Sequence, residues 1–391
     1  MAERAPDQHG VRRPRSVGQR FVALFGSLEL SCTLLLLLGL LTWLGTLAQV
    51  EHGLFEVQKK YFESYLLVHW LGPVPIPLPG ANLVMSVLFV NLVVGGMLRL
   101  RASFDRNLGV LATHLGIALL FLSGFVKLHH SEEGHVTLFE GQSSATYQSY
   151  HRWELAISEA LPDGSVREHL VPQEAFLQAT NAQGVRLQGS DLPFDVELRY
   201  FMPNCSVGAD GAGGVMLRAL PLDAQSERNI AGAQVLLRGH DGSEHAGLVW
   251  GRDLHPFGAR VAERRFAVDL RHERYPMPFR ITLDDFQKED HPGTGMPKSF
   301  LSDVRVQAGP TERAVRISMN EPLRDEGLVL YQASWGPANA APGAPLFSTL
   351  AVVRNPADQW PLIGCIVIAL GMAGHFGRML WRNLRRQGAR S

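Results

Sequence analysis

The sequence predicts an α-helical membrane protein with four transmembrane helices and a large all-β extracytoplasmic domain, sandwich- or barrel-like, inserted between the third and fourth helices. Three observations carry this prediction. Long apolar segments lie toward both ends of the 391-residue chain, arginines flank them, and the polar stretch before the last segment alternates with a period of two. Apolar residues make up 46% of the chain, an average that hides this division.

Each apolar segment approaches the length of about 20 residues that a membrane helix needs. Each is longer than the core of a signal peptide, and a cleaved leader would not be followed by three more spans. Asn91 is a polar exception inside the second segment, where a hydrogen bond to a neighbouring helix is expected. The predicted spans are Leu28–Val50, Ala81–Leu98, Leu108–Leu128 and Trp360–Leu380.

Arginines predict the orientation, because positive residues next to spans favour the cytoplasmic side. Both termini and the loop between the second and third spans are then cytoplasmic, and the β-rich segment lies outside the inner (cytoplasmic) membrane, in the periplasm of a bacterium. The predicted regions are tail 1–27, membrane region 28–128 with outer loop 51–80, outer domain 129–358, fourth helix 359–380 and tail 381–391. The arginines are Arg4, Arg12, Arg13, Arg15, Arg20, Arg99, Arg101, Arg106, Arg378, Arg382, Arg385, Arg386 and Arg390.

The outer domain alternates apolar and polar residues in short runs, which is typical of half-buried strands. Turn sequences such as Pro162-Asp163-Gly164, Asp241-Gly242 and Pro292-Gly293 separate the runs. About ten to fourteen strands are expected. The alternating positions include Phe194, Val196, Leu198, Tyr200, Phe266, Val268, Leu270, Ile281, Leu283, Val304, Val306, Val315 and Ile317.

The outer loop between the first two spans has a helical pattern of its own. Tyr61, Phe62, Tyr65 and His69 recur at helical spacing, which predicts an amphipathic helix over Phe55–Trp70 on the outer membrane surface. The proline-rich run Pro73–Pro79 would then turn the chain back into the lipid bilayer.

Charge and cysteine content exclude several classes of protein. Net charge is zero, so nothing indicates a nucleic-acid partner. Of the three cysteines only Cys205 lies in the polar segment, and no C-x-x-C or C-x-x-C-H occurs, which argues against thiol-redox chemistry and a c-type cytochrome. The acidic cluster Asp284–His291 fits no closed metal-ligand set, so no metal site is expected.

Several short motifs occur in two groups, one in the membrane region and a more specific one in the third quarter of the chain. The motifs are Leu44-Gly45-Thr46-Leu47, Thr113-His114-Leu115-Gly116, Phe279–Phe286, Pro292–Pro297, Phe300–Val304, Asn320-Glu321-Pro322-Leu323, Leu330–Trp335 and Asn355-Pro356. Together these motifs resemble the ResB/CcsB family of cytochrome c biogenesis proteins, whereas residues 150–275 carry no family signature.

The resemblance implies a function that composition does not show. ResB/CcsB proteins pair with a CcsA/ResC-type membrane protein, and the pair delivers haem, here haem b, to apocytochrome c. The Trp-rich haem-handling motif belongs to the partner, so this chain is not expected to catalyse haem attachment alone. The alternatives are a membrane scaffold that binds no haem, whose outer domain docks apocytochrome or a respiratory complex, and a transporter or receptor.

Two intramembrane histidines are candidate haem ligands. His114 lies about 9 Å inside the third span at 1.5 Å per residue, and ionisable groups inside a membrane are costly and usually functional. Family similarity suggests that it is an axial ligand, and an interhelical hydrogen bond is the alternative. His375 lies at a similar depth in the fourth span and could be a second ligand, although the family pattern places that ligand on the partner.

Three further histidines lie near the predicted outer surface. His69, His129 and His130 are weaker candidates for contact with exported haem, and aromatic neighbours of His69 could stack on a porphyrin. A polar anchor at the membrane boundary explains these histidines as well.

Overall fold

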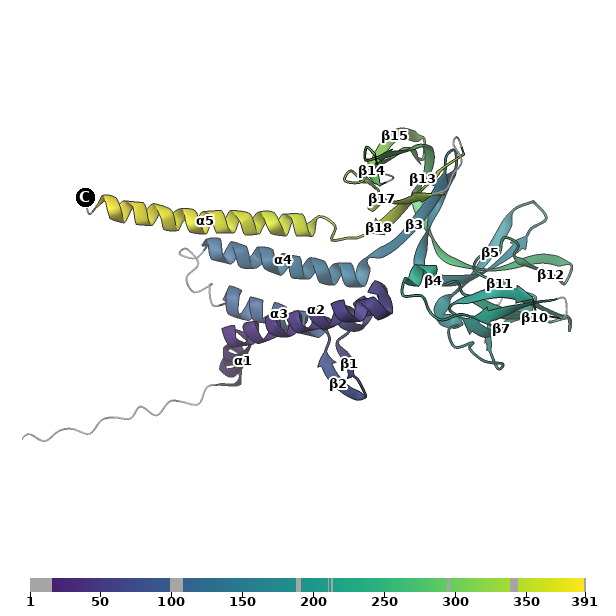
Figure 1. The fold of residues 1–391 in the computed structure, drawn as a ribbon, viewed down its shortest axis with the longest axis horizontal. Helices are drawn as coiled ribbons and strands as arrows, with labels where there is room; N and C mark the ends of the chain where they lie inside the picture. Colours follow the sequence, from purple (N-terminus) through teal and green to yellow (C-terminus); the bar gives the residue numbers. More distant parts are fainter. Residues whose placement is uncertain are drawn as a thin grey trace, which may run out of the picture. The chain divides into compact units, whose positions relative to one another are not determined.

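A computed structural model describes residues 16–98, 108–187, 191–209, 211, 214–293, 296–337 and 344–389 (Figure 1). It divides into a helical unit, Met1–His52, Glu56–His130 and Pro356–Ser391, and a β unit, Ser131–Asn355 with Gly53–Phe55. Eight of the arginines that predict the orientation lie outside the described residues, so the orientation stays a prediction: Arg4, Arg12, Arg13, Arg15, Arg99, Arg101, Arg106 and Arg390.

Three helices in the described part of the helical unit are long and apolar enough to cross a membrane: Leu28–Glu63, Leu108–His130 and Trp360–Gly388. The apolar helix Ala81–Gly96 is shorter, so the fourth span stays a prediction. The helical elements are α1 Val17–Phe25, α2 Leu28–Val57 with the π-helical turn Gln58–Glu63, α3 Ala81–Asn91 with the π-helical segment Leu92–Leu98, α4 Leu108–His130 and α5 Trp360–Gly388.

The first long helix bends back on itself. Gly53 interrupts α2 with φ +75°, a conformation that glycine adopts without steric cost. The residues beyond it return along the helix, because Phe62 and Val57 pack against Gly45. Leu41, Val57 and Tyr61 are buried together in a core that also takes residues from α3.

Asn91 joins the end of α3 to the start of α2, as the sequence predicts. Its amide nitrogen donates to the carbonyl oxygens of Phe25 and Ser27 at 2.8 and 2.9 Å, and its oxygen accepts from the Ser31 hydroxyl at 2.6 Å. A buried amide in an apolar helix bundle needs such partners to offset its desolvation.

The amphipathic helix predicted over Phe55–Trp70 is correct only for its first half. The chain is helical to Glu63 and then forms strand β1 Leu66–Leu71, which pairs with β2 Val74–Pro79. Gly72, with φ +60°, takes the first central position of the turn and Pro73 the second, an arrangement typical of a type II′ hairpin. The run Leu66–Leu71 has no alternating polar residues, so its period of two is invisible in the sequence.

Glycines bring α4 and α5 into close antiparallel contact, and Figure 1 shows the two helices side by side. A Cβ at Gly109 would lie 2.6 Å from the carbonyl oxygen of Gly371, and one at Gly116 would lie 2.7 Å from that of Gly364. The glycines on each helix are seven residues apart and share one face. This glycine seam packs the two backbones as small residues do in membrane helix pairs.

The β unit contains sixteen strands in its described part, slightly more than the ten to fourteen expected. They form sheets of ten, four and two strands. The strands are β3 Glu132–Phe139, β4 Ser143–Ala160, β5 Val166–Pro172, β6 Val185–Leu187, β7 Phe194–Met202, β8 Cys205–Ala209, β9 Val215–Ala219, β10 Gly232–Gly239, β11 Glu244–Trp250, β12 Phe257–Val261, β13 Arg264–Asp290, β14 Pro297–Ala308, β15 Thr311–Ser318, β16 Leu323–Asp325, β17 Leu328–Gly336 and β18 Phe347–Arg354.

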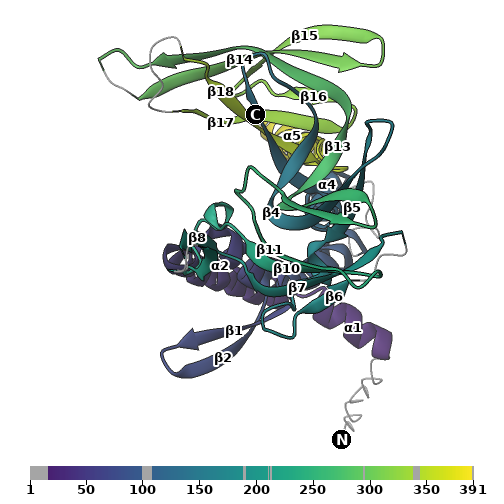
Figure 2. The same ribbon diagram turned by 90° about the vertical axis from the view of Figure 1, so that its right-hand side faces the viewer.

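Two lobes share the long strands β4 and β13 (Figure 2). In the sandwich lobe, the sheet β11-β10-β7-β6 packs its apolar face on the first half of β13 and the second half of β4. In the rolled lobe, the order β15-β14-β13-β4-β3-β18-β17-β16 curls until β15 contacts β16 and β17. The alternating residues predicted to face inward are buried in these two cores, except the half-buried Val315 and the exposed Tyr200.

A large bulge lies where the two lobes meet. Trp153 pairs with His272 and Gln148 pairs with Arg274, so the four β4 residues between them oppose Glu273 alone. The Ser149 hydroxyl accepts from the backbone of Arg152 at 3.1 Å and organises the extra residues. Bulges bend a strand and redirect side chains, and this one gathers aromatic and imidazole rings.

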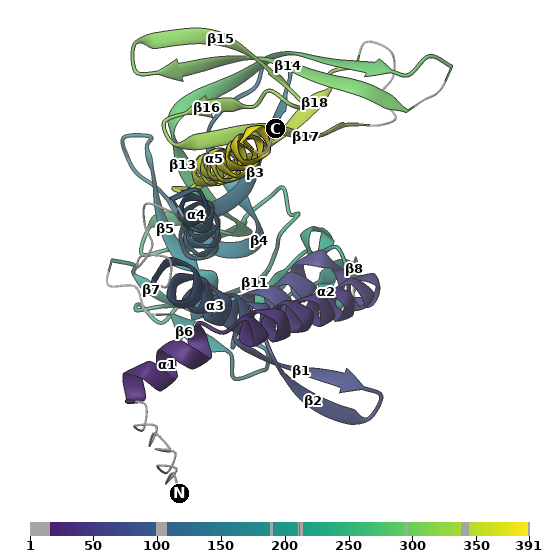
Figure 3. The same ribbon diagram turned by 90° about the vertical axis from the view of Figure 1, so that its left-hand side faces the viewer.

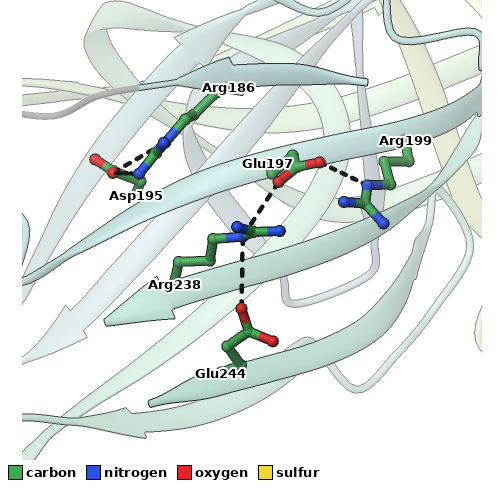
Figure 4. A network of polar contacts seen from close by, with 6 residues as sticks. All are labelled: Arg186, Asp195, Glu197, Arg199, Arg238 and Glu244. Atoms are coloured by element: carbon green, nitrogen blue, oxygen red, sulfur yellow. Dashed lines mark hydrogen bonds and ion pairs between the residues drawn. The ribbon is translucent and has the colours of Figure 1, made fainter. Parts of the chain in front are cut away.

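The outward face of the four-stranded sheet carries a ladder of ion pairs across its strands (Figure 4). Arg186 pairs with Asp195, and Glu197 is 2.6 Å from Arg199 and 3.3 Å from Arg238, which also approaches Glu244. Opposite charges across strands stabilise a water-facing sheet surface modestly. The ladder explains how this face remains polar while the opposite face is apolar.

Candidate functional site

His114 lies in the first half of α4, and its own helix orients the ring. Its Nδ1 atom is 2.8 Å from the carbonyl oxygen of Val110, one turn earlier. A carbonyl oxygen can only accept, so Nδ1 carries the proton and Nε2 keeps its lone pair. Within the described ranges no group hydrogen-bonds Nε2. With Nδ1 as the donor, Nε2 is the ring nitrogen that could act as a ligand atom.

A glycine in the π-helical segment makes room for this ring. A Cβ at Gly96 would overlap Cδ2 of His114 and would lie 2.8 Å from Nε2. Any side chain at residue 96 would therefore displace the imidazole. Short π-helical segments are rare and frequently occur at functional sites, so the pairing of Leu92–Leu98 with His114 strengthens the candidate. The sequence did not indicate the role of Gly96.

The structure does not bring His375 to the His114 ring. His375 lies on α5, where its backbone nitrogen and Cβ pack against Gly109 in the glycine seam. His114 follows Gly109 by five residues, which turns it roughly 140° around α4 at 3.6 residues per turn. His114 therefore lies on a different face of α4 from the face that packs against His375. A haem site that uses both rings stays a prediction, and this arrangement favours a second ligand from elsewhere.

Of the three outer histidines, which stay predicted candidates, His69 contacts a side chain of another element. Its Nδ1 is 2.7 Å from the hydroxyl of the buried Tyr61, so one nitrogen already has a structural partner. His129 and His130 are exposed at the last turn of α4, and Nδ1 of His129 donates to the Phe125 carbonyl at 3.0 Å. His114 and His129 thus make the same kind of local hydrogen bond, each to the carbonyl oxygen four residues earlier, but in different surroundings.

A cluster of imidazole and aromatic rings, which the sequence did not indicate, lies at the bulge of the β unit. His135 stacks on Tyr150 at 4.6 Å between ring centroids, and His272 stacks on Trp153 at 4.0 Å. Burial lowers the pKa of His135, and burial together with the charges of His135 and His151 lowers the pKa of His272 to about 4. Both rings are therefore neutral at physiological pH. No spacing signal could reveal the cluster, because strand pairing assembles it from β3, β4 and β13.

A second aromatic cluster lies in the rolled lobe. The rings of Phe286, Phe300 and Trp335, on β13, β14 and β17, lie 6.2–6.3 Å apart between centroids. The Lys288 ammonium is 4.6 Å from the Trp335 ring centroid, a cation–π contact. Three motifs distant in the sequence, Phe279–Phe286, Phe300–Val304 and Leu330–Trp335, are thus neighbours in the fold.

These features define a class: a protein with several helices able to span a membrane, a histidine oriented within one of them, and a large all-β unit between α4 and α5 in the sequence. Residues 258–345 match the model of the ResB-like family. This segment contains β13 to β17 and the aromatic cluster of the rolled lobe. The resemblance to the ResB/CcsB family that the sequence motifs predict is therefore confirmed.

Curated proteins with similar sequences are named cytochrome c biogenesis proteins. The chain is 33% identical over 84 residues to a cytochrome c biogenesis protein CcsB of Prochlorococcus marinus (strain SARG), covering 21% of the chain and 18% of the relative. Against the Synechococcus sp. (strain RCC307) CcsB it is 30% identical over 128 residues, covering 30% and 27%. Against the P. marinus (strain MIT 9313) CcsB it is 26% identical over 352 residues, covering 88% and 65%. The chain spans less than two thirds of each of these relatives.

Proposed function

We propose that this chain is a membrane subunit of a cytochrome c biogenesis system and that it handles haem on the way to apocytochrome c. Its similarity to CcsB proteins supports the system, and one observation supports haem handling: Nδ1 of His114 is occupied by Val110, which leaves Nε2 available beside Gly96. The chain acts as a haem-binding subunit rather than a catalyst by itself.

His114 would hold haem iron through Nε2. The hydrogen bond to Val110 holds the ring orientation and keeps the proton off the ligating nitrogen. Haem b supplies the vinyl groups that cytochrome c maturation modifies. The contribution of this chain would be to bind and orient the macrocycle near α4 and the π-helical segment, whose Gly96 lets the His114 ring pack against its backbone.

A further ligand to the haem would come from a CcsA/ResC-type membrane partner. His375 faces the glycine seam on another side of α4, which supports a ligand from outside the chain. The β unit would then lie on the outer side of the cytoplasmic membrane, where apocytochrome c receives haem. Protease accessibility of a tag at the exposed Asp163 turn in intact cells tests that placement.

The decisive experiment compares His114→Ala with His129→Ala in the complex purified with its membrane partner. The two histidines make the same hydrogen bond one turn back along α4, so the control removes an equivalent local contact. We expect His114→Ala to lose the low-spin haem spectrum, His129→Ala to keep it, and His114→Gly to regain it with added imidazole. His375→Ala should keep the spectrum.

Full haem content in purified His114→Ala would contradict the proposal. Failure of wild type to carry haem under any condition would favour the scaffold alternative, in which the β unit only docks apocytochrome or a respiratory complex. Gly96→Val sharpens the test, because its side chain would displace the His114 ring without removing the ligand.

A further inference from the structure

We propose that the hairpin β1–β2 lies in the interface of a lipid bilayer, with its turn inserted at the boundary between headgroups and acyl chains. The hairpin connects the end of the first long helix to the start of α3, and Figure 3 shows it projecting from α2. The proposal does not depend on haem handling.

The composition of the hairpin suits lipid better than water. Residues 65–80 contain no Asp, Glu, Lys or Arg, and His69 is their one ionisable side chain besides Tyr65. At the turn end, Trp70, Leu71 and Val74 are 59%, 65% and 55% exposed. An isolated two-stranded hairpin is marginally stable in water, and an exposed apolar patch indicates an interaction surface. Trp and Tyr are the residues enriched at membrane interfaces.

Prolines remove the hydrogen-bond donors from one edge of the hairpin. Leu71 pairs with Val74 across the two-residue turn, and Gly80 donates to the Tyr65 carbonyl at 2.8 Å. The alternation of an antiparallel ladder then places Pro75, Pro77 and Pro79 at positions whose nitrogens point away from β1. The outer edge of β2 therefore offers carbonyl acceptors and no N–H groups in this run.

An edge without donors has two physical consequences. Another strand cannot add to it with a full ladder, which disfavours a protein partner that binds by strand pairing. No N–H group there loses its hydrogen bond when the edge enters an apolar medium. The outer edge of β1 keeps the N–H groups of Leu66, Val68 and Trp70, which headgroup phosphates or interfacial water can satisfy. One edge has no N–H donors in this run, whereas the other has donors that need hydrogen-bond partners. The hairpin therefore fits the bilayer interface, where such partners are present, rather than the bilayer centre.

The base of the hairpin is tied to the helices, which fixes its position next to the candidate spans. Leu67 and its cross-strand partner Leu78 pack with the core that contains Leu41 and Tyr61. The bond between His69 and Tyr61 adds a polar tie. The apolar surface of the free end is thus continuous with helices that themselves expose apolar side chains.

The test uses the full chain in lipid vesicles of phosphatidylcholine and phosphatidylglycerol. Cys32, Cys205 and Cys365 are replaced by serine or alanine, and an environment-sensitive fluorophore is attached at Leu71→Cys or, separately, Val74→Cys, both exposed positions. Asp163→Cys, in an exposed polar turn of the β unit, is the matched control. Lipids that carry a doxyl quencher at a shallow acyl position report contact.

We expect the shallow quencher to reduce emission at residues 71 and 74 about twofold or more, because interfacial elements lie about 5–10 Å into the boundary. A deep quencher should act less, and the control label should not respond. Equal responses at residues 71 and 163 would overturn the proposal. Labels shielded from aqueous iodide yet insensitive to doxyl lipids would also overturn it, since they would indicate a protein contact.

Discussion

The helical unit and the β unit place their side chains in opposite ways. In the helical unit, glycines form the contact between α4 and α5, while large apolar residues such as Leu362 and Phe376 are exposed. In the β unit, apolar residues fill two cores and ion pairs line the outer sheet face. Lipid gives apolar side chains no reason to be buried, whereas water does. The contrast is the one expected between a unit whose helices are able to span a membrane and a unit that buries its apolar side chains from water.

The same contrast holds for buried polar groups. Those of the helical unit are neutral, namely Asn82, Asn91 and Ser123, whereas the β unit also buries Glu154, Glu159 and Glu197. Each of these carboxylates has an arginine partner. A folded, water-surrounded β unit can hold such pairs in place, but each pair becomes costly when one partner is removed.

The largest expected effect follows from breaking such a pair. Arg271 is 2.8 Å from the buried Glu154 and binds Glu168 with two 2.8 Å hydrogen bonds. Arg271→Ala should lower the free energy of unfolding of the β unit by about 3–5 kcal/mol, because it leaves a buried carboxylate without a partner. Urea denaturation of the full chain in detergent, followed by tryptophan fluorescence, measures it.

Arg316→Ala is the control for that experiment. Arg316 also pairs with a carboxylate, Asp303, at 2.8 Å, but on the surface, where solvent screens the pair. We expect no measurable change in the urea midpoint. Equal losses for the two variants would show that burial does not govern the strength of these pairs.

The next largest effect is a pH dependence of the free energy of unfolding, and it arises from a histidine in the β unit. Burial lowers the pKa of His272 to about 4, so the folded chain keeps this ring neutral while the unfolded chain protonates it from about pH 6.5 downward. The unfolded state then binds more protons, and unfolding becomes easier by at most about 3 kcal/mol between pH 6.5 and pH 4.

Denaturation midpoints of wild type and His272→Phe at pH 7 and pH 4.5 measure the contribution of His272 to the pH dependence of stability. Phenylalanine keeps a ring against Trp153 and cannot titrate, so the variant should lose less stability on acidification than wild type. Identical pH profiles would show that His272 does not carry the dependence.

A smaller effect is expected in the glycine seam of the helical unit. Gly116→Leu forces apart backbones in van der Waals contact and should cost about 1–3 kcal/mol, as overpacking does. A Cβ at Gly124 on the same helix meets no atom within 4 Å, so Gly124→Leu serves as the matched control. Thermal aggregation in detergent should begin at a lower temperature for Gly116→Leu only. Coincident aggregation curves for the two variants would argue against close backbone packing in the glycine seam.

The smallest effect concerns reactivity rather than folding. Cys205 is buried in the sandwich lobe, and burial raises its pKa to about 11. At pH 8 its alkylation should be about 100-fold slower than that of an unperturbed thiol, because the thiolate reacts. Mass spectrometry after timed iodoacetamide labelling checks this, with urea-unfolded protein as the reference. Rapid labelling of folded protein would show that the lobe opens.

The sequence by itself determined the features that depend on local composition. Long apolar segments predicted four spans, of which three are helices long and apolar enough to cross a membrane, and alternation predicted the buried faces of β7, β13, β14 and β15. Asn91 was assigned a helix-bridging hydrogen bond because an amide in an apolar segment needs a partner. These inferences work because desolvation acts on each segment wherever it lies in the fold.

Only the tertiary structure decided which residues meet. It formed a hairpin from Leu66–Pro79, placed Gly96 against His114, placed His375 on α5 beside another face of α4, and gathered His135 and His272 at a bulge. Such contacts join residues that lie from a few to more than a hundred positions apart in the sequence. Packing and strand pairing over the whole chain select them, and no local period records that choice.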